Sequence, residues 1–389
     1  MTPAARVGAA IGILDAILAG QPAEPALLAW ARASRFAGSG DRAAVRDLVF
    51  EALRRRDSLA ALGGGLGGRG LMLGLARLRG DDPAAIFSGQ GHAPAPLAPG
   101  EGEGAASPSD ADALSDLPGW IWPEWQRSLG GGALAAAHLM RGRAPVWLRV
   151  NPRLATPARA AAALAGDGIG TDPHPALPSA LRVSEGERRI AASRAYLDGM
   201  VELQDLSPQM ACALLPLRKG DRVLDYCAGG GGKSLALAAR ADIALTAHDA
   251  APARMSDLPA RARRARVPIT VSPPQRLARA YDLVVVDVPC SGSGTWRRTP
   301  DAKWRLTPDG LDALRDTQAA ILRDVAGLVV PGGHLAYMTC SVLAQENEDR
   351  IDDFLNDNNA FRKVSDRRWL QPDGSDGFYL SLLRREGAD

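Results

Sequence analysis

The sequence contains few cysteines and no long apolar run. Only four of its 389 residues are cysteine, and their wide spacing predicts neither a disulfide scaffold nor a C-x-x-C zinc site. We therefore predict no bound metal. No run of about eighteen apolar residues occurs, so we predict no membrane partner. The N-terminal stretch lacks the charged start, apolar block and cleavage site of a secretory signal, which predicts a cytoplasmic protein.

Lysine is also scarce, because the basic residues are almost all arginine. Four lysines stand against 42 arginines, and the net charge is only +2. Between Ala251 and Pro300 there are nine arginines and three aspartates. The planar guanidinium suits phosphate binding and base stacking, although a GC-rich genome produces the same bias. The local excess of positive charge favours a polyanionic partner.

The length and the rhythm of the chain predict several domains. Residues 1–87 are predicted to be an all-helical domain, with Asp41 as a candidate N-cap. Residues 88–113, rich in Pro, Gly, Ala and Ser, are predicted to be a flexible linker or loop. Residues 114–205 are expected to form a small α+β domain, with a helix capped near Thr156. From 206 to 389, apolar strands alternate with helices, which predicts a mostly parallel sheet.

Three tryptophans occur within six residues, in "WIWPEW" at 120–125. Such a cluster at the start of a helix is more often packing between domains than a surface for stacking on bases. We therefore expect packing, with base stacking as the alternative.

A glycine-rich loop, "VLDYCAGGGGKSLALAAR" (223–240), joins a predicted strand to a predicted helix. Glycine lets the backbone turn sharply and approach a ligand, and free amides at a helix start favour an anionic group. A Walker loop is excluded because Cys227 occupies the position of its first glycine, six residues before Lys233. Asp249 ends the next strand, where a carboxylate can accept hydrogen bonds from ribose hydroxyls. The pattern favours a nucleotide-like cofactor, with a tight structural turn as the alternative.

Two thiols follow two other predicted strands. Cys290 stands in "DVPCSG" and Cys340 in "YMTCS". A single cysteine at a strand end is usually a core residue, and we expect this of Cys212 on its apolar helix. Open α/β sheets bind ligands at the carboxyl ends of their strands, however, and Asp287 lies next to one of the thiols. This combination predicts a functional pair.

The motifs "DYCAGGGGKS", "DVPCSGSGTWRRTPDAKW" and "YMTCSVLAQENED" occur in this order and resemble those of RNA cytosine-5 methyltransferases of the Sun (RsmB-like) type. The similarity extends upstream through "LRVNPRLAT" and "GMVELQDLSPQMAC" and covers roughly residues 115–385. The helical segment ending "DRAAVRDLVFEALRRR" is similar to a NusB-like RNA-binding domain. The resemblance implies an α/β fold class: a Rossmann-like class I methyltransferase domain, with a small α+β domain before it and an all-helical N-terminal domain.

The resemblance also implies an activity, namely S-adenosylmethionine-dependent methylation of a cytosine C5 in RNA, most often ribosomal RNA, by a monomer. In this family the thiol of T-C-S attacks the base, which assigns the nucleophile to Cys340. Cys290 is assigned to breaking the covalent adduct, and Asp287 to contacting the pyrimidine edge and the cofactor. The alternatives are a noncatalytic RNA-binding or ribosome-assembly protein, and a DNA cytosine-5 methyltransferase whose nucleophile would be Cys290.

The cofactor-binding residues implied by the resemblance are Cys227, Ala228, Gly229, Gly230, Gly231, Gly232, Lys233, Asp249 and Asp287. Lys233 either holds the methionine carboxylate or positions the loop. The family usually has alanine and proline where this chain has Gly229 and Gly230, which predicts a more flexible loop.

Three further expectations concern residues outside the loop. The usual acid after the third strand is missing, so we expect adenine to be recognised either by backbone amides and apolar walls or by Gln275. Lys303 and its neighbouring arginines are expected near the RNA backbone, with a solvated loop as the alternative. Gln204 and Asp205 are expected either to guide the substrate strand or to form a turn.

Overall fold

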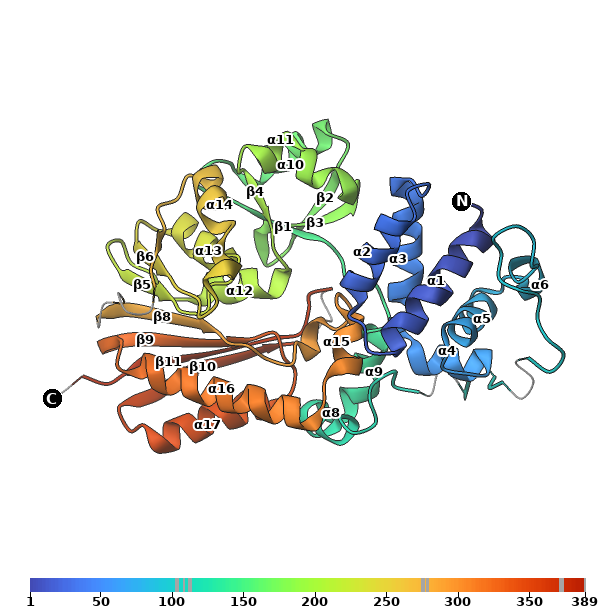
Figure 1. The fold of residues 1–389 in the computed structure, drawn as a ribbon. Coiled ribbons are helices and arrows are strands. Elements are labelled where there is room, and N and C mark those ends of the chain that lie inside the picture. The colour runs from blue at the N-terminus through green and yellow to red at the C-terminus, as the bar shows by residue number, and fades with distance from the viewer. Residues whose placement is uncertain are drawn as a thin grey trace. The chain divides into compact units, whose positions relative to one another are not determined.

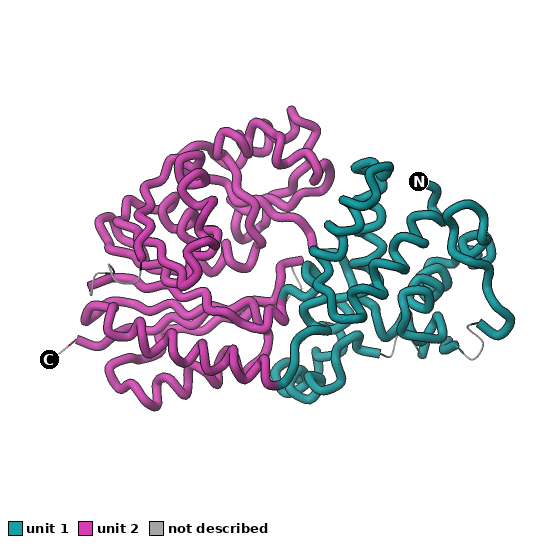
Figure 2. Tube along the Cα trace, viewed as in Figure 1, with its two compact units in different colours: residues 1–143, 295–308 teal, residues 144–294, 309–389 magenta. Residues whose placement is uncertain are grey.

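The computed structural model describes residues 1–101, 105–107, 109–110, 114–273, 277, 280–370 and 374–387. The described chain forms two compact units (Figure 2). Met1–Arg143 and Thr295–Pro308 make the first unit, and Ala144–Gly294 and Asp309–Asp389 make the second. The four domain ranges given above stay predictions.

The first unit is helical (Figure 1). Its core includes the fully buried Leu14, Leu53 and Leu71. The helices are α1 (Pro3–Leu18), α2 (Ala23–Ala33), α3 (Ser39–Arg54), α4 (Arg56–Gly63), α5 (Gly68–Arg79), α6 (Pro83–Ile86), α8 (Trp122–Leu129), α9 (Ala133–Leu139) and α15 (Pro300–Arg305). Among the described residues, the only candidate for crossing a membrane is the pair α4 and α5, which is bent by 87°, since neither helix passes the length and hydropathy test alone.

The predicted N-cap at Asp41 is wrong. The residue before α3 is Gly38, and Asp41 lies in the first turn of the helix. Its carboxylate accepts hydrogen bonds from the amino group of Met1 at 3.2 Å and from Arg6 Nε at 2.9 Å. Asp41 therefore ties α3 to the start of α1 instead of capping its own helix.

The tryptophan cluster contributes to the packing of the first unit. Trp125 is fully buried and stacks on Trp296, with ring centroids 5.8 Å apart and planes inclined by 12°. The Nε1 atom of Trp125 donates to the carbonyl of Ala133 at 2.9 Å. Trp120, by contrast, is 37% exposed. Trp125 is therefore a packing residue, and both of its partners belong to its own unit.

The second unit begins with a four-stranded antiparallel sheet in the order β2-β3-β1-β4. Its elements are β1 (Trp147–Val150), α10 (Pro157–Gly166), β2 (Gly170–His174), β3 (Leu177–Glu185), α11 (Arg194–Leu197) and β4 (Val201–Leu203). Thr156 Oγ1 accepts a hydrogen bond from the backbone N–H of Arg159 at 3.3 Å, which confirms it as the cap of α10. Leu148 and Leu164 join the strands and α10 in one core.

The larger sheet has seven strands in the order β10-β11-β9-β8-β5-β6-β7. Its strands are β5 (Arg222–Asp225), β6 (Ala244–Ala247), β7 (Thr270–Val271), β8 (Tyr281–Asp287), β9 (Val329–Thr339), β10 (Phe361–Trp369) and β11 (Phe378–Arg385). The strands β5 to β9 are parallel, whereas β10 and β11 pair antiparallel. The chain runs outward from β5 to β7 and returns to β8 beside β5. The strand order therefore reverses between β5 and β8, where open α/β sheets bind ligands.

Helices cover both faces of this sheet (Figure 1). Leu237 and Leu258 pack on one face together with Cys212, which confirms that Cys212 is a core residue. Leu322 and Ile351 pack on the other face. The helices are α12 (Leu206–Leu214), α13 (Gly232–Arg240) and α14 (Leu258–Ala265) on the first face, and α16 (Pro308–Ala326) and α17 (Glu348–Asp357) on the second.

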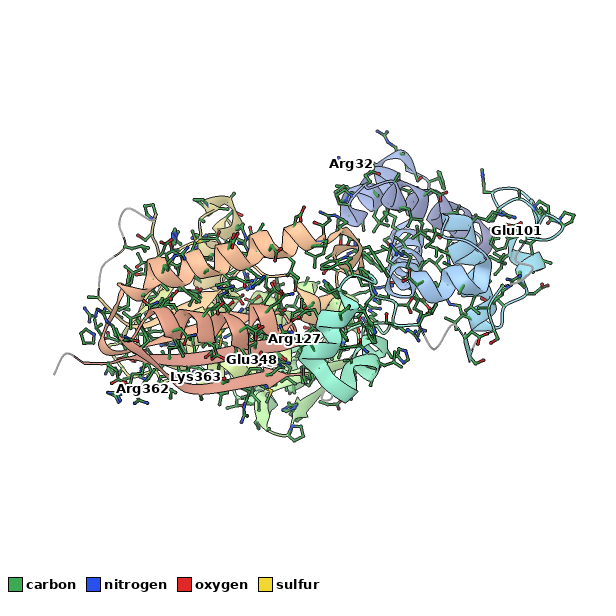
Figure 3. All side chains as sticks on the ribbon, turned by 90° about the horizontal axis from the view of Figure 1, so that it is seen from below. Arg32, Glu101, Arg127, Glu348, Arg362 and Lys363 are labelled. Carbon is green, nitrogen blue, oxygen red and sulfur yellow. The ribbon has the colours of Figure 1, made fainter. Side chains whose placement is uncertain are left out.

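The edge strand β10 is charged. Lys363 Nζ lies 3.0 Å from Asp352 Oδ1, and Arg368 pairs with Glu348, so both bonds join β10 to α17 (Figure 3). Charged side chains on an edge strand discourage pairing with another sheet.

Candidate functional site

The glycine loop turns between β5 and α13. Gly229 and Gly231 have φ angles of +50° and +79°, a region that L-residues with a side chain avoid. A Cβ atom on Gly231 would also lie 2.2 Å from Leu258 Cδ1. The sharp turn exposes the start of α13 to the carboxyl edge of the sheet, and it requires glycine at position 231.

This loop forms one wall of a cavity of about 260 Å³. The cavity is lined by Gln204, Pro208, Asp225, Cys227, Ala228, Gly229, Gly230, Gly232, Lys233, Arg254 and Asp287. Most of the predicted cofactor residues therefore surround one space, while Gly231 and Asp249 are not part of its lining. The cavity lies at the carboxyl ends of β5 and β8, as the strand order requires.

Two buried oxygens in the lining are available to a ligand. Asp225 Oδ1 and Gln204 Oε1 accept no hydrogen bond within the described part of the chain. Buried acceptors of this kind are costly unless a partner reaches them. A ligand with ammonium or hydroxyl donors, as in an aminoacyl nucleoside, would satisfy both oxygens, so the residues fit such a cofactor.

Asp225 was missed in the sequence, although "RVLDY" places it at the end of the first strand of the domain. Its side chain is fully buried and accepts a hydrogen bond from Ser234 Oγ at 2.6 Å. Burial raises the pKa of this carboxyl to about 6, in spite of the bond from Ser234 and the nearby charge of Lys233.

Asp249 follows β6 and stabilises the glycine loop through hydrogen bonds from backbone N–H groups. Its Oδ2 accepts from the backbone N–H of Gly229 at 2.9 Å, and its Oδ1 accepts from the N–H of Ala251 at 2.9 Å. Arg254 Nη1 lies 3.2 Å from the same carboxylate. These bonds fix the shape of the loop, and the ribose contact of Asp249 stays a prediction.

Lys233 connects the glycine loop to β8. Its Nζ atom donates to Asp287 Oδ2. Burial lowers the pKa of Lys233, but the charge and hydrogen bond of Asp287 together with the charges of Cys212 and Asp225 outweigh that effect, and the pKa ends above its ordinary value. Lys233 is therefore a cation at neutral pH, and it holds the carboxylate of Asp287 at the cavity.

The two thiols predicted from the sequence meet. Cys290 follows β8, Cys340 follows β9, and their Sγ atoms are 3.4 Å apart. The hydrogen bond with Cys340 and burial, supported by the charges of Cys340 and Glu346, raise the pKa of Cys290 well above its ordinary value. Cys290 is therefore a protonated thiol at neutral pH and can donate a hydrogen bond to the sulfur of Cys340.

Cys227 is a different kind of thiol. It lines the cavity, and burial together with the surrounding carboxylates, Asp225 first among them, raises its pKa far above the ordinary value. A thiol that stays protonated is a poor nucleophile. This favours a contribution of Cys227 through the backbone of the loop and not through its sulfur.

The expectation for Lys303 is wrong. Lys303 is only 1% exposed, and its Nζ donates to the carbonyls of Arg54 at 2.9 Å and Asp116 at 2.6 Å. Its neighbour Arg297 is buried as well. Lys303 holds its segment within the helical unit, because backbone carbonyls take the hydrogen bonds that RNA phosphates were expected to take.

The other residues expected to contact the substrate or the cofactor have different outcomes. Gln204 lines the cavity, whereas Asp205 caps α12, with its Oδ1 accepting from the N–H groups of Ser207 and Asp376 at 3.1 and 3.0 Å. The turn interpretation is therefore correct for Asp205. Gln275, the candidate adenine contact, lies outside the described residues.

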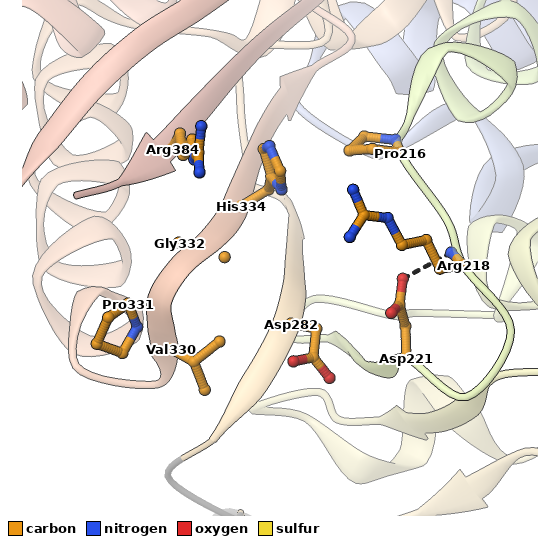
Figure 4. A pocket seen from close by; sticks show the side chains of 10 residues that line it. Pro216, Arg218, Asp221, Asp282, Val330, Pro331, Gly332, His334 and Arg384 are labelled. Carbon is orange, nitrogen blue, oxygen red and sulfur yellow. Dashed lines mark hydrogen bonds between the residues drawn. The ribbon is translucent and has the colours of Figure 1, made fainter. Parts of the chain in front are cut away.

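A second cavity, of about 500 Å³, lies at the opposite edge of the sheet (Figure 4). It is lined by residues before or near the amino ends of β5, β8 and β9, among them Arg218, Asp282 and Val330, and by Arg384 at the carboxyl end of β11. None of the residues predicted for catalysis or cofactor binding lines it. Its position away from the strand ends that carry the thiols separates it from the candidate site.

The fold and the glycine loop define a methyltransferase-type α/β domain, and the comparisons with known proteins agree. Residues 212–383 match the family model "16S rRNA methyltransferase RsmB/F". Residues 117–188 match the ferredoxin-like domain of RsmF/B-like methyltransferases. The resemblance found in the motifs is therefore confirmed for residues 212–383, which match the model of the RsmB/F methyltransferase family.

Curated relatives are also similar to this chain. Ribosomal RNA small subunit methyltransferase B of Salmonella paratyphi B is 34% identical over 248 residues, which cover 61% of this chain and 57% of the relative. The corresponding protein of Salmonella heidelberg has the same identity and coverage. This chain thus spans little more than half the length of the curated relatives that it matches.

Solved structures share the fold. PH0851 aligns with a TM-score of 0.76 and 21% identity over 99% of both chains. A methyltransferase homolog protein from Pyrococcus horikoshii aligns with a TM-score of 0.62 and 22% identity over 72% of this chain and all of the other. NSun6 from Pyrococcus horikoshii with SFG aligns with a TM-score of 0.61 and 15% identity over 70% of this chain and 99% of the other. The predicted fold class is confirmed.

Proposed function

We propose that this protein is an S-adenosylmethionine-dependent RNA cytosine-5 methyltransferase whose substrate is ribosomal RNA. The observation that carries the proposal is the pair of thiols, Cys290 and Cys340, held 3.4 Å apart at the same sheet edge as the cofactor-type cavity. The similarity of residues 212–383 to 16S rRNA methyltransferases, and the name of the Salmonella relatives, favour ribosomal RNA.

The chemistry explains why thiols are needed. Carbon 5 of cytosine is a weak nucleophile, but addition of the Cys340 thiolate to C6 gives it enamine character. S-adenosylmethionine, when bound, would supply the methyl group to carbon 5, with its sulfur–methyl bond breaking to leave a neutral thioether. Water then takes the C5 proton, the electron pair of the C5–H bond restores the C5–C6 double bond, and the electron pair of the C6–sulfur bond leaves with Cys340 as thiolate.

The groups next to Cys340 suit these reaction steps. The thiol of Cys290 can donate a hydrogen bond to the sulfur of Cys340, which stabilises the thiolate that departs from the adduct. Asp287, held by Lys233, is assigned to the pyrimidine edge, where it stabilises the adduct by hydrogen bonding. The target base must be unpaired or flipped to reach these groups.

The cavity is assigned to the cofactor. Asp225 and Gln204 provide the buried acceptors, and the loop from Cys227 to Gly232 provides backbone close to the ligand. Lys233 and Asp287 form the wall shared with the base. A cytoplasmic monomer without a metal remains our expectation.

The test is methyl transfer from labelled S-adenosylmethionine to ribosomal RNA lacking the modification, followed by nucleoside analysis, with duplex DNA in parallel. We expect label in 5-methylcytidine from RNA only, and none with Cys340→Ala. Label in DNA would favour the DNA enzyme. Absence of label in both, with cofactor bound, would favour the noncatalytic assembly protein.

A further inference from the structure

The two thiol-bearing loops are joined beneath the site by one buried carboxylate. Glu346 ends the short 3-10 helix Ala344–Glu346 and is fully buried. Its Oε1 accepts from the backbone N–H of Ser291 at 2.8 Å. Its Oε2 accepts from the hydroxyls of Ser291 and Ser341, the latter at 2.6 Å. The residue that follows each thiol is therefore bonded to the same carboxylate oxygen.

A second polar residue supports the loop of Cys290 from the other side. Gln318 lies on the buried face of α16 and is itself fully buried. Its Nε2 donates to the carbonyl of Pro289 and to Glu346 Oε1, both at 3.0 Å. Cys290 is thus flanked on both sides by residues of this network.

The loop of Cys340 is held in the same way. The hydroxyl of Thr339 is bonded to Asn347 Oδ1, and Asn347 Nδ2 donates to the carbonyl of Ser341 at 3.0 Å. Ser341 Oγ also donates to Glu346, so Cys340 lies between two fixed residues. Since consecutive Cα atoms are about 3.8 Å apart, fixing the neighbours of each thiol restricts the distance between the two sulfurs.

Burying a carboxylate is costly, and packing alone does not require one here. Glu346 receives four hydrogen bonds, from Ser291 N, Ser291 Oγ, Ser341 Oγ and Gln318 Nε2. Bonds to an ionised acceptor are roughly twice as strong as neutral ones, which favours one fixed geometry over several. The carboxylate of Glu346 therefore lies where it determines the separation of the two thiol-bearing loops.

We propose that Glu346 is a positioning residue that holds Cys290 and Cys340 at the separation needed for release of the covalent adduct. This inference rests on the proposed function and deepens it. A glutamine side chain has only one accepting oxygen, so it cannot accept hydrogen bonds from donors on both of its sides. Glu346→Gln therefore loosens one loop relative to the other. Adduct formation needs Cys340 alone, whereas release needs both thiols in register, so release suffers more.

The first test measures thiol spacing without any RNA. Phenylarsine oxide exchanges its oxygen for two nearby thiol sulfurs and releases water, and peptide mass spectrometry identifies the bridged pair. We expect the wild type to bridge Cys290 to Cys340 and Glu346→Gln to do so at least tenfold more weakly in competition with a free dithiol. Glu348→Gln is the matched control, since the carboxylate of Glu348, which is labelled in Figure 3, pairs with Arg368 and not with the residues of this network, and its bridging should equal that of the wild type.

The second test follows the reaction. A displacement of about 1 Å costs on the order of 100-fold in rate, so kcat of Glu346→Gln should fall by about that factor, and KM for RNA should fall with it because slow release keeps the RNA bound as adduct. A denaturation-resistant protein–RNA adduct should accumulate although Cys290 is present, an outcome that general destabilisation does not produce. If Glu346→Gln fails to fold, Ser341→Ala tests the role of Glu346 in its place. This variant removes one of the four donors, so we expect a smaller loss of arsenical bridging.

The outcomes separate the two proposals. Unchanged arsenical bridging in Glu346→Gln, or in Ser341→Ala where the first variant does not fold, overturns the role of Glu346 whatever the enzyme methylates. A wild-type protein that bridges the arsenical but methylates no RNA overturns the proposed function and leaves the positioning claim standing on the first test.

Discussion

Two cysteines of identical chemistry acquire different properties from their surroundings. Cys290 is held as a thiol by its hydrogen bond to Cys340, by burial and by the charge of Glu346, which lies under the same loop. A protonated thiol next to a second sulfur donates a hydrogen bond and does not compete for attack. The sequence order of the two motifs alone does not contain this asymmetry.

The burial of the Asp225 carboxyl gives a prediction for the free energy of unfolding. The folded-state pKa of about 6 lies above the ordinary 3.8, so the ionised carboxylate costs stability above pH 6, and the cost disappears as the pH falls through 6 toward 4. Asp225→Asn should therefore be more stable than the wild type at pH 7, by up to about 3 kcal/mol. The difference should shrink toward zero near pH 4.

Urea unfolding of both proteins across this pH range measures the difference. Binding of S-adenosylmethionine should weaken at the same time, because the amide offers a donor where the ligand needs an acceptor. A difference in the free energy of unfolding that does not change with pH would contradict the role of the buried charge.

At the scale of elements, the turn from β5 into α13 depends on two backbone conformations. Gly231→Ala places a Cβ against Leu258 at a φ of +79°, so we expect a loss of about 2 kcal/mol in the free energy of unfolding and weaker cofactor binding. The matched control is Gly230→Ala, whose Cβ meets only the end of the Arg261 side chain at 2.9 Å. Calorimetric titration with S-adenosylmethionine and urea unfolding compare the two, and equal losses in both variants would contradict the account.

The elements also show how far the sequence could be interpreted. The strands β5, β6, β8 and β9 were predicted because apolar runs alternate with helices, and Thr156 was recognised as a cap. The strand β10 was not predicted, because its residues are mostly charged and its place at the sheet edge lets them face α17 and solvent. Its partner β11 was missed with it, since antiparallel pairing of the last two strands breaks the strand–helix rhythm.

At the scale of the whole molecule, the sequence could not predict which charged residues are buried by contacts with residues far away in the chain. Lys303 was expected to meet phosphate, but carbonyls of Arg54 and Asp116, far away in the chain, take its hydrogen bonds. Burial lowers its pKa to about 7. Glu346 stood in a quoted motif without a role, because only the meeting of β8 and β9 brings both serine-bearing loops to it. The thiols themselves were predicted, since residue type, strand ends and motif order agreed.

The central claim, that Cys340 attacks the base and Cys290 releases it, is tested most directly by trapping the adduct. Cys290→Ala, incubated with S-adenosylmethionine and ribosomal RNA, should give a denaturation-resistant protein–RNA band. Mass spectrometry of the digested band should find the methylated cytidine on Cys340, and Cys290→Ala/Cys340→Ala should give no band. A wild-type-like turnover of Cys290→Ala without a band, or a linkage to any residue other than Cys340, would contradict the account.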